Sequence, residues 1–231
     1  MDLYIVDHKK LGLEGKWRDI MPFLTEHERQ KAERYRFEAD KIRSAVGAFL
    51  IRTMASRSFP ETEIVIERTD SGKPYLAGQS GYEFSLSHSG DLIVLATDVC
   101  PVGVDVERIR REKDWRIFHR YLSEAEMTMI ENAEDQASEF FRVWTIREAF
   151  SKEEGEGLAI FDKDFTVDYE HKTILYKSRE LSFSTTDYPE YKISICSPHK
   201  TDDMSIHCLS EKDWSEIHSS SIVAGGLLVQ S

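Results

Sequence analysis

Apolar side chains recur at steps of three and four residues between residues 38 and 57, which is the spacing of one helix face. Just upstream, residues 25–28 read TEHE, and Thr25 followed by Glu28 has the spacing of a capping box that starts a helix. Short apolar and alternating runs come next and predict strands. The half of the chain that ends near residue 101 therefore predicts two helices, followed by the strands EIVIER, KPYL, YEFSLS and LIVLATD.

The second half repeats this order of elements. The strand VGVDVER is followed by a helical stretch from about residue 114, a second capping box in SEAE at residues 123–126, and a longer helix over about 137–154. FTVDY, TILYK, LSFSTT, YKISIC and MSIHCL then predict strands. The pattern predicts an α+β fold made of two similar half-domains related by a pseudo-twofold duplication, with a ligand cleft between them. The expected boundaries are residues 1–101, residues 102–218 and a tail, residues 219–231, for which a strand, surface packing and disorder all remain open.

Charge limits the classes of partner. The 231-residue chain carries a net charge of −12, which argues against general nucleic-acid binding, because that affinity comes largely from basic groups that release counterions from phosphates. Residues 29–43 and residues 108–120 nevertheless hold six Lys or Arg each, against three and two acids. Such local patches suit a small phosphorylated ligand or an acidic protein partner, although solvated helix faces are an equal alternative.

Cysteine usage and hydropathy indicate the cellular compartment of the protein. Cys100, Cys196 and Cys208 are an odd number without CxxC spacing, so we expect reduced thiols rather than a disulfide framework or a zinc site. No segment has the pattern of a membrane span or a secretion signal. We therefore expect a cytoplasmic protein that does not bind membranes.

Three acidic residues carry the candidate chemistry. Asp105 and Glu107 lie two residues apart on a mostly apolar strand, so both carboxylates leave the same face. In WTIREAFSKEEGEGL, residues 144–158, Glu148 and Lys152 are four residues apart and share a helix face. Taken singly, an exposed edge strand and a surface ion pair explain these residues as well. Together, three carboxylates offer the oxygen ligands that Mg²⁺ prefers and leave coordination positions for water and phosphate.

Two further segments point to phosphate. SLSHSG, residues 85–90, ends a strand with Ser87, His88 and Ser89, and GKPYL places Lys73 before a proline in extended backbone. Each segment alone is an ordinary turn. The GxxxxGK[ST], GxGxxG and GxSxG patterns do not occur, which argues against the common nucleotide-binding loops and against a hydrolase nucleophile elbow.

The combination of GKP, SHS, GVDVE and WxxREAxxKxxGxGL, in this order, resembles the Sfp-type 4'-phosphopantetheinyl transferase family over about residues 25–160. The resemblance implies a pseudodimeric chain that binds coenzyme A and Mg²⁺ between its halves. It implies Mg²⁺-dependent transfer of 4'-phosphopantetheine from coenzyme A to a serine of an acyl or peptidyl carrier protein, with release of 3',5'-ADP. Fatty-acid, polyketide and nonribosomal-peptide carriers are all compatible with it, and it favours a monomer.

The resemblance also implies roles for individual residues. Asp105, Glu107 and Glu148 match the metal ligands, Glu148 is also a candidate general base, and Lys152 matches the lysine at the diphosphate. The expected contacts to the adenosine phosphates are Lys73, Ser87 and His88, and those to the 3'-phosphate are Lys31, Arg43 and Ser44. The sequence departs from the family at Arg147, where lysine is usual.

The carrier is expected to dock on the basic segment that follows the metal-binding strand. Close to that surface, its positive charge would attract an acidic carrier despite the net charge of the chain. The expected docking residues are Arg108, Arg110, Arg111, Lys113, Arg116 and Arg120, with Phe118, Tyr121 and Leu122. Two alternatives remain open at this point: a non-catalytic module that binds a carrier protein or coenzyme A, and a metal-dependent nucleotide hydrolase.

Overall fold

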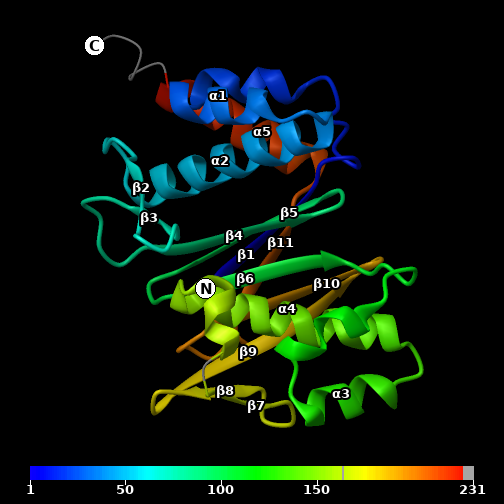
Figure 1. Cartoon of the computed structure of the whole chain (residues 1–231). Helices are drawn as coiled ribbons and strands as arrows, with labels where there is room; N and C mark the ends of the chain where they lie inside the picture. The colour runs from blue at the N-terminus through cyan, green and yellow to red at the C-terminus, as the bar shows by residue number, and fades with distance from the viewer. Residues whose placement is uncertain (163, 226–231) are drawn as a thin grey trace.

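A computed structural model of the chain describes residues 1–162 and 164–225, and it contains two sheets with helices packed against each (Figure 1). The first sheet has the strand order β11-β1-β5-β4, the second has the order β6-β10-β9-β8-β7, and β2 pairs with β3 in a separate ribbon. The strands are β1 (Asp2–Asp7), β2 (Ile66–Arg68), β3 (Pro74–Leu76), β4 (Glu83–Ser89), β5 (Leu92–Asp98), β6 (Gly103–Arg108), β7 (Thr166–Asp168), β8 (Thr173–Tyr176), β9 (Arg179–Tyr188), β10 (Tyr191–Ser197) and β11 (Ser205–Cys208). The helices are α1 (Glu26–Arg34), α2 (Glu38–Ser58), α3 (Glu124–Glu131), α4 (Gln136–Glu154) and α5 (Glu211–Gly225), with 3-10 helices η1 (Trp17–Phe23), η2 (Trp115–Tyr121) and η3 (Gly157–Asp162). The predicted α+β class is confirmed.

Both predicted capping boxes start helices. At α1, the Thr25 hydroxyl accepts a hydrogen bond from Glu28 N, and the Glu28 carboxylate accepts one of 2.8 Å from Thr25 N. Ser123 and Glu126 make the reciprocal pair of bonds at the start of α3. These bonds satisfy backbone donors that the first turn of a helix leaves free.

Helix α4 lies against β6 and β10 of the second sheet, with α3 beside it (Figure 1). The contact requires a glycine on β6, because a Cβ atom at Gly103 would lie 1.9 Å from the carbonyl oxygen of Ala149. The helix ends at Gly155, whose φ of 75° is the left-handed conformation common at helix C-termini. Two glycines thus fix how closely, and over what length, α4 covers the strand that carries Asp105 and Glu107.

Strands β4 and β6 belong to different sheets but lie side by side at the junction of the two halves. Alternate serines of β4 supply hydroxyl oxygens that accept hydrogen bonds from backbone N–H groups of β6. The bonds are Val104 N to Ser85 at 3.0 Å, Val106 N to Ser87 at 3.4 Å, and Arg108 N to Ser89 at 3.1 Å. The serine hydroxyls therefore accept hydrogen bonds from backbone N–H groups at the edge of β6 that would otherwise be unpaired.

The C-terminal segment returns to the first half of the molecule. Strand β11 pairs in parallel with β1, and α5 packs near η1. The ring of Trp214 on α5 contacts that of Phe49 on α2. This differs from the expectation that residues 102–218 form one half-domain. The physical reason is that β1 has a free edge that β11 can pair with. Within the tail, residues 219–225 belong to α5, and residues 226–231 lie outside the described residues.

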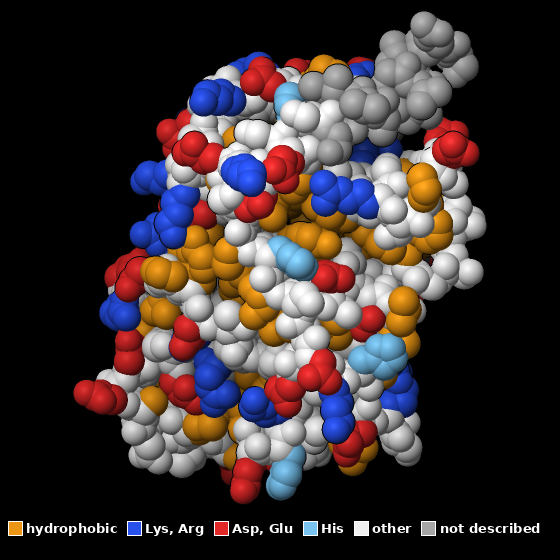
Figure 2. Space-filling model, turned by 180° about the vertical axis from the view of Figure 1, so that it is seen from behind, with side chains coloured by type: hydrophobic (Ala, Val, Ile, Leu, Met, Phe, Trp, Pro, Cys, Tyr) orange, Lys and Arg blue, Asp and Glu red, His pale blue; other side chains and the backbone are white. Residues whose placement is uncertain are grey.

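Charged side chains of both signs are mixed on the rear face, and apolar side chains gather in a band across its middle (Figure 2). The net negative charge is therefore not concentrated into one acidic field on that face. Within residues 1–162 and 164–225, no helix is both long and apolar enough to cross a membrane.

Candidate active site

The centre of the candidate site is Asp105, a buried carboxylate on β6. Its Oδ1 accepts hydrogen bonds from Lys152 Nζ at 2.7 Å and from the Ser87 hydroxyl at 2.8 Å. Lys152 Nζ also donates to Ser87 Oγ at 2.8 Å. The structure thus brings three predicted site residues from β4, β6 and α4 together. Because the only hydroxyl proton of Ser87 is given to Asp105, a phosphate contact by this serine would require that bond to break.

Glu107 lies on the same face of β6 and is held in a similar way. Its Oε2 accepts a hydrogen bond of 2.7 Å from Ser89 and lies 3.2 Å from Arg110 Nη2. Burial raises the pKa of the Glu107 carboxyl, the bond from Ser89 lowers it, and the negative charge of Asp105 raises it further. The serines at positions 87 and 89 therefore each position one of the two acids.

Glu148 faces these acids from α4. Burial raises the pKa of Glu148 to about 7, with a further increase from Asp105, a decrease from Lys152, and another increase from Glu107. The three carboxylates are thus near enough to repel one another, although they come from two separate segments. A carboxyl with a pKa near neutrality can both release and accept a proton under ordinary conditions.

The residues fit a divalent cation in one respect that can be observed directly. Asp105 Oδ2 is buried and has no hydrogen-bond partner among the described residues, which is costly unless a cation or donor binds it. Among residues 1–162 and 164–225, however, no three His, Cys, Asp or Glu side chains are already gathered as a ligand set. Lys152 is the cation beside Asp105 in this arrangement. The side chain of Lys152 is 30% exposed.

A pocket of about 450 Å³ opens beside Glu148 and Lys152 and reaches the GKP segment. Lys73 lines it and donates a hydrogen bond of 2.7 Å to the carbonyl oxygen of Glu153 near the end of α4. Burial lowers the pKa of the Lys73 ammonium, and the negative charge of Glu153 partly offsets this. The pocket is lined by Ser71, Gly72, Lys73, Pro74, Phe84, Ser85, Leu86, Glu148, Ser151, Lys152, Gly155 and Gly157.

The other expected phosphate contacts lie on the first half. Arg43, on α2, forms an ion pair with Asp40 and donates a hydrogen bond of 2.6 Å to the carbonyl oxygen of Gly90. Desolvation lowers the pKa of His88, and the positive charge of Arg43 lowers it further, which places these two side chains in the same region. Ser44 is half-buried on α2. Lys31 is exposed on α1, where desolvation and the charge of Arg68 lower its pKa and the charge of Glu28 raises it.

The departure at Arg147 has a structural explanation. Arg147 is buried on α4, and its Nη1 lies 2.9 Å from both carboxylate oxygens of Glu126 on α3. The guanidinium also lies over the rings of Phe161 and Phe165. The hydroxyl of Tyr169 donates a third bond to the Glu126 carboxylate at 2.6 Å. Arg147 therefore joins α3 to α4 and does not face Asp105.

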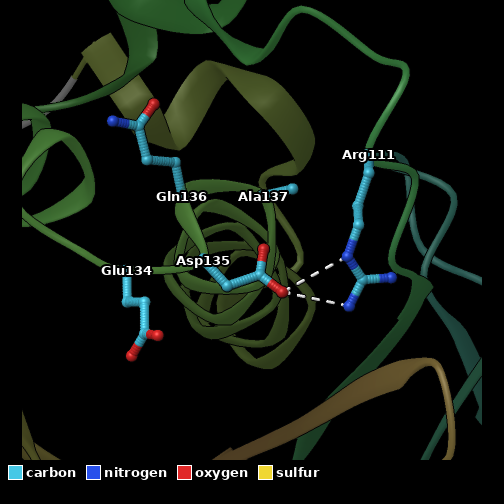
Figure 3. A pocket seen from close by; sticks show the side chains of 5 residues that line it. All are labelled: Arg111, Glu134, Asp135, Gln136 and Ala137. Atoms are coloured by element: carbon cyan, nitrogen blue, oxygen red, sulfur yellow. Dashed lines mark hydrogen bonds and ion pairs between the residues drawn. The ribbon is translucent and has the colours of Figure 1, made fainter.

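A second hollow, of about 730 Å³, lies at the start of α4 (Figure 3). Asp135 is the N-cap residue of α4, and its carboxylate is paired with Arg111 at 3.0 Å, as the close-up shows. Glu134, Gln136 and Ala137 complete the lining. Asp135 and Arg111 offset each other's charge in this hollow, whereas the pocket beside Glu148 contains a carboxyl whose pKa burial raises to about 7.

Ser85 was not expected from the sequence to take part in the site, and the positioning roles of Ser89 and Glu126 were not predicted. Ser85 and Ser89 join β4 to β6, and Glu126 pairs with Arg147. The alternation of serines in SLSHS was the available signal for the first two, because side chains two residues apart on a strand share a face. Glu126 was recognised only as a capping residue, and nothing local in the sequence shows its partner 21 residues away.

Comparison with known proteins gives consistent matches across the chain. Residues 12–100 match the family model described as 4'-phosphopantetheinyl transferase, N-terminal, and residues 101–219 match that of the 4'-phosphopantetheinyl transferase superfamily. The chain is 32% identical over 188 residues to 4'-phosphopantetheinyl transferase psf-1 of Bacillus pumilus, which covers 77% of this chain and 80% of the relative. It is 33% identical over 193 residues to 4'-phosphopantetheinyl transferase gsp of Aneurinibacillus migulanus, and the match covers 78% of this chain and 80% of the relative.

A third relative is 4'-phosphopantetheinyl transferase Sfp of Bacillus subtilis (strain 168), 26% identical over 196 residues, with 78% of this chain and 84% of the relative covered. Together, the two family models reach from residue 12 to residue 219 and meet between residues 100 and 101. The chain belongs to the 4'-phosphopantetheinyl transferase superfamily and is an enzyme of its Sfp type.

Proposed function

We propose that the enzyme transfers the 4'-phosphopantetheine group of coenzyme A to a serine of an acyl or peptidyl carrier protein and releases 3',5'-ADP. The observation that carries this proposal is the state of Asp105. Its Oδ2 is buried without a hydrogen-bond partner in residues 1–162 and 164–225, and its Oδ1 accepts a bond from Lys152. The negative charges of Glu148 and Glu107 act on it from nearby. Such a cluster is suited to a cation and a bound diphosphate.

Asp105, Glu107 and Glu148 would hold Mg²⁺, which when bound neutralises charge on a diphosphate during phosphoryl-type transfer. Lys152 would exchange its bond to Asp105 for one to a diphosphate oxygen, since its ammonium is a point charge on a long, partly exposed stem. Ser87 and Ser89 keep the two acids of β6 in place through their hydroxyl groups.

Glu148 is our candidate for taking the proton of the carrier serine. Without a metal ion, burial raises its pKa to about 7. With Mg²⁺ beside it, the carboxylate would be ionised and able to accept the proton. Lys73, at the far side of the pocket, would contact the adenosine phosphates, and His88 and Arg43 offer positive or donor groups on the first half. Ser44 and Lys31 complete the proposed contacts to the 3'-phosphate.

The carrier would dock on η2 and the basic segment before it. Arg116 and Arg120 are exposed there, and Ile117 is 63% exposed, which is unusual for a large apolar side chain. Phe118, expected to contact the carrier, packs instead against the rings of Phe140 and Trp144. We therefore add Ile117 to the proposed surface as its exposed apolar residue.

One assay tests the proposed reaction. The protein is incubated with coenzyme A, Mg²⁺ and an apo carrier protein, and the carrier is weighed by mass spectrometry while 3',5'-ADP is measured. We expect the carrier to gain the phosphopantetheine mass and one 3',5'-ADP to appear for each. Release of 3',5'-ADP without the gain in mass would indicate a hydrolase. If no 3',5'-ADP appears and the carrier gains no mass, the protein is a binding module.

A further inference from the structure

Cys100, His199 and Asp98 form a chain of contacts outside the proposed active site. The Sγ of Cys100 lies 3.1 Å from His199 Nε2, and His199 Nδ1 lies 3.3 Å from Asp98 Oδ2. Cys100 belongs to the segment that connects β5 to β6, and therefore the two halves of the molecule, while His199 follows β10. Neither the proposed transfer reaction nor the pocket beside Glu148 uses these residues.

The acid of this group is fixed, whereas the histidine is accessible. Asp98 is 4% exposed and accepts hydrogen bonds from Val99 N at 2.7 Å and from the Ser197 hydroxyl at 3.4 Å; the amine of Met1 lies 3.9 Å from it. Ser197 also accepts a bond of 3.2 Å from His199 N, which holds the backbone of the histidine. The His199 side chain is 49% exposed.

The order of contacts determines the roles. With Nδ1 of His199 facing the Asp98 carboxylate, the favoured tautomer carries its proton on Nδ1, and Nε2 is free to accept the thiol proton of Cys100. A thiol, a base within hydrogen-bond reach and a third group that orients the base are the components of an activated nucleophile. The other two thiols differ, because Cys196 is fully buried and Cys208 is exposed.

We propose that Cys100 is a reactive thiol that forms mixed disulfides with low-molecular-weight disulfides, with His199 as its base and Asp98 as the residue that positions His199. In the reaction, Cys100 Sγ attacks one sulfur of the small disulfide as its proton passes to His199 Nε2. The bond between the two sulfurs of the small disulfide breaks, and a new bond joins one of them to Cys100. The other half leaves as a thiolate and receives the proton from His199, so no further oxidant is required.

The test uses glutathione disulfide as the probe and the folded, full-length protein. The rate of mixed-disulfide formation is measured separately at Cys100 and Cys208 by peptide mass spectrometry between pH 6.5 and 8.5. Cys208 is the internal reference because it is the more exposed thiol, so access alone would make it react faster. We expect Cys100 to react about 10-fold faster or more at pH 7, since base catalysis contributes at least that much.

His199→Ala should reduce the rate at Cys100 to that of Cys208 or below, without changing the rate at Cys208. Asp98→Asn should slow Cys100 and change the pH dependence of its rate, which a purely structural role would not do. If Asp98→Asn fails to fold, the half-exposed His199→Ala variant still decides. Equal rates at Cys100 and Cys208 in the folded wild-type protein, or an unchanged Cys100 rate in His199→Ala, would overturn the proposal. In guanidinium chloride, the two thiols should react alike.

Discussion

Lys152 Nζ lies 2.7 Å from Oδ1 of Asp105, so the α4 helix places a cation against the buried acid of β6. Within the part of the chain that the structure describes, the other oxygen of Asp105 has no hydrogen-bond partner. The lysine offsets part of the repulsion among Asp105, Glu107 and Glu148, whose charges act on one another. This pair connects the stability of the junction with the proposed chemistry, because the same ammonium is needed at both.

Lys152→Met should therefore reduce stability as well as transfer. Removing the ammonium leaves the buried Asp105 oxygen with only the Ser87 bond, which should cost about 1–3 kcal/mol in the free energy of unfolding. Transfer should fall by about 100-fold or more, as when a donor to developing charge is removed. Urea unfolding and the carrier assay measure the two effects. Lys172→Met is the matched control, because Lys172 pairs with Asp202 at an exposed site; equal effects in the two variants would contradict this role of Lys152.

Arg147→Met should destabilise the protein without affecting the proposed chemistry directly. It leaves Glu126 as a buried charge without its guanidinium, which should cost about 3–5 kcal/mol by urea unfolding. In the double variant with Glu126→Gln, most of that loss should be recovered, because glutamine carries no charge and can still accept the capping bond from Ser123 N. If the loss in the double variant equals the sum of the losses in Arg147→Met and Glu126→Gln measured singly, Arg147 and Glu126 do not act as a pair.

A pH effect is expected from Glu153, at the end of α4. Burial and the neighbouring Glu154 raise the pKa of Glu153 to about 7 in the folded protein, from an ordinary value near 4.5. Between these two pKa values the folded state binds more protons than the unfolded state, so this group lowers the free energy of unfolding as pH rises from about 4.5 to 7. Glu153→Gln removes that contribution. The free energy of unfolding of the variant, relative to wild type, should therefore be higher at pH 8 than at pH 5.

Urea unfolding at pH 5 and pH 8 tests this prediction. Glu180→Gln, at an exposed position on β9, is the control and should follow the wild-type pH dependence. The expected sign is opposite to that of a salt-bridged surface carboxylate, which gains stability as pH rises. A Glu153→Gln variant with the same pH dependence as wild type would show that Glu153 is already ionised at pH 5 in the folded protein.

Charge reversal on η2 should weaken the use of the carrier protein selectively. Arg116→Glu with Arg120→Glu should raise the KM for an acidic carrier on the order of 10-fold, an effect that decreases at high salt. The KM for coenzyme A should stay the same, because neither side chain lines the pocket beside Glu148. Lys172→Glu reverses one charge away from η2, a change of two charge units against four in the double variant, and serves as the control. An unchanged KM for the carrier would refute docking at this surface.

Local features of the fold were predictable from the sequence because local bonds produce them. The capping boxes at Thr25 and Ser123 each satisfy donors within three residues, and the apolar period of α2 defines its buried face. The strand β1 was not predicted, nor was its parallel pairing with β11. That pairing joins the two ends of the chain, and no periodicity encodes a contact over 200 residues.

The candidate site shows the same division. Asp105 and Glu107 were expected to share a face because strand geometry alone requires it, whereas the convergence of Glu148 depends on how α4 crosses β6. That crossing is set by Gly103, where any larger residue would meet the backbone of Ala149. The hydroxyl bonds from Ser87 and Ser89 depend on the approach of β4 to β6, which belong to different sheets. These contacts are tertiary, so composition and spacing do not determine them.

The proposed reaction depends on the binding of one divalent cation by Asp105, Glu107 and Glu148. Its most direct test is calorimetric titration of Mg²⁺ into the protein with coenzyme A present, using wild type, Glu107→Gln and the control Glu180→Gln. We expect one site per chain in wild type and in the control. In Glu107→Gln, we expect the affinity for Mg²⁺ to be weakened by about 10-fold or more, with transfer mostly lost and the fold intact. A Glu107→Gln variant that binds Mg²⁺ with wild-type affinity and keeps near-normal transfer at limiting Mg²⁺ would contradict the binding of the cation by these three residues.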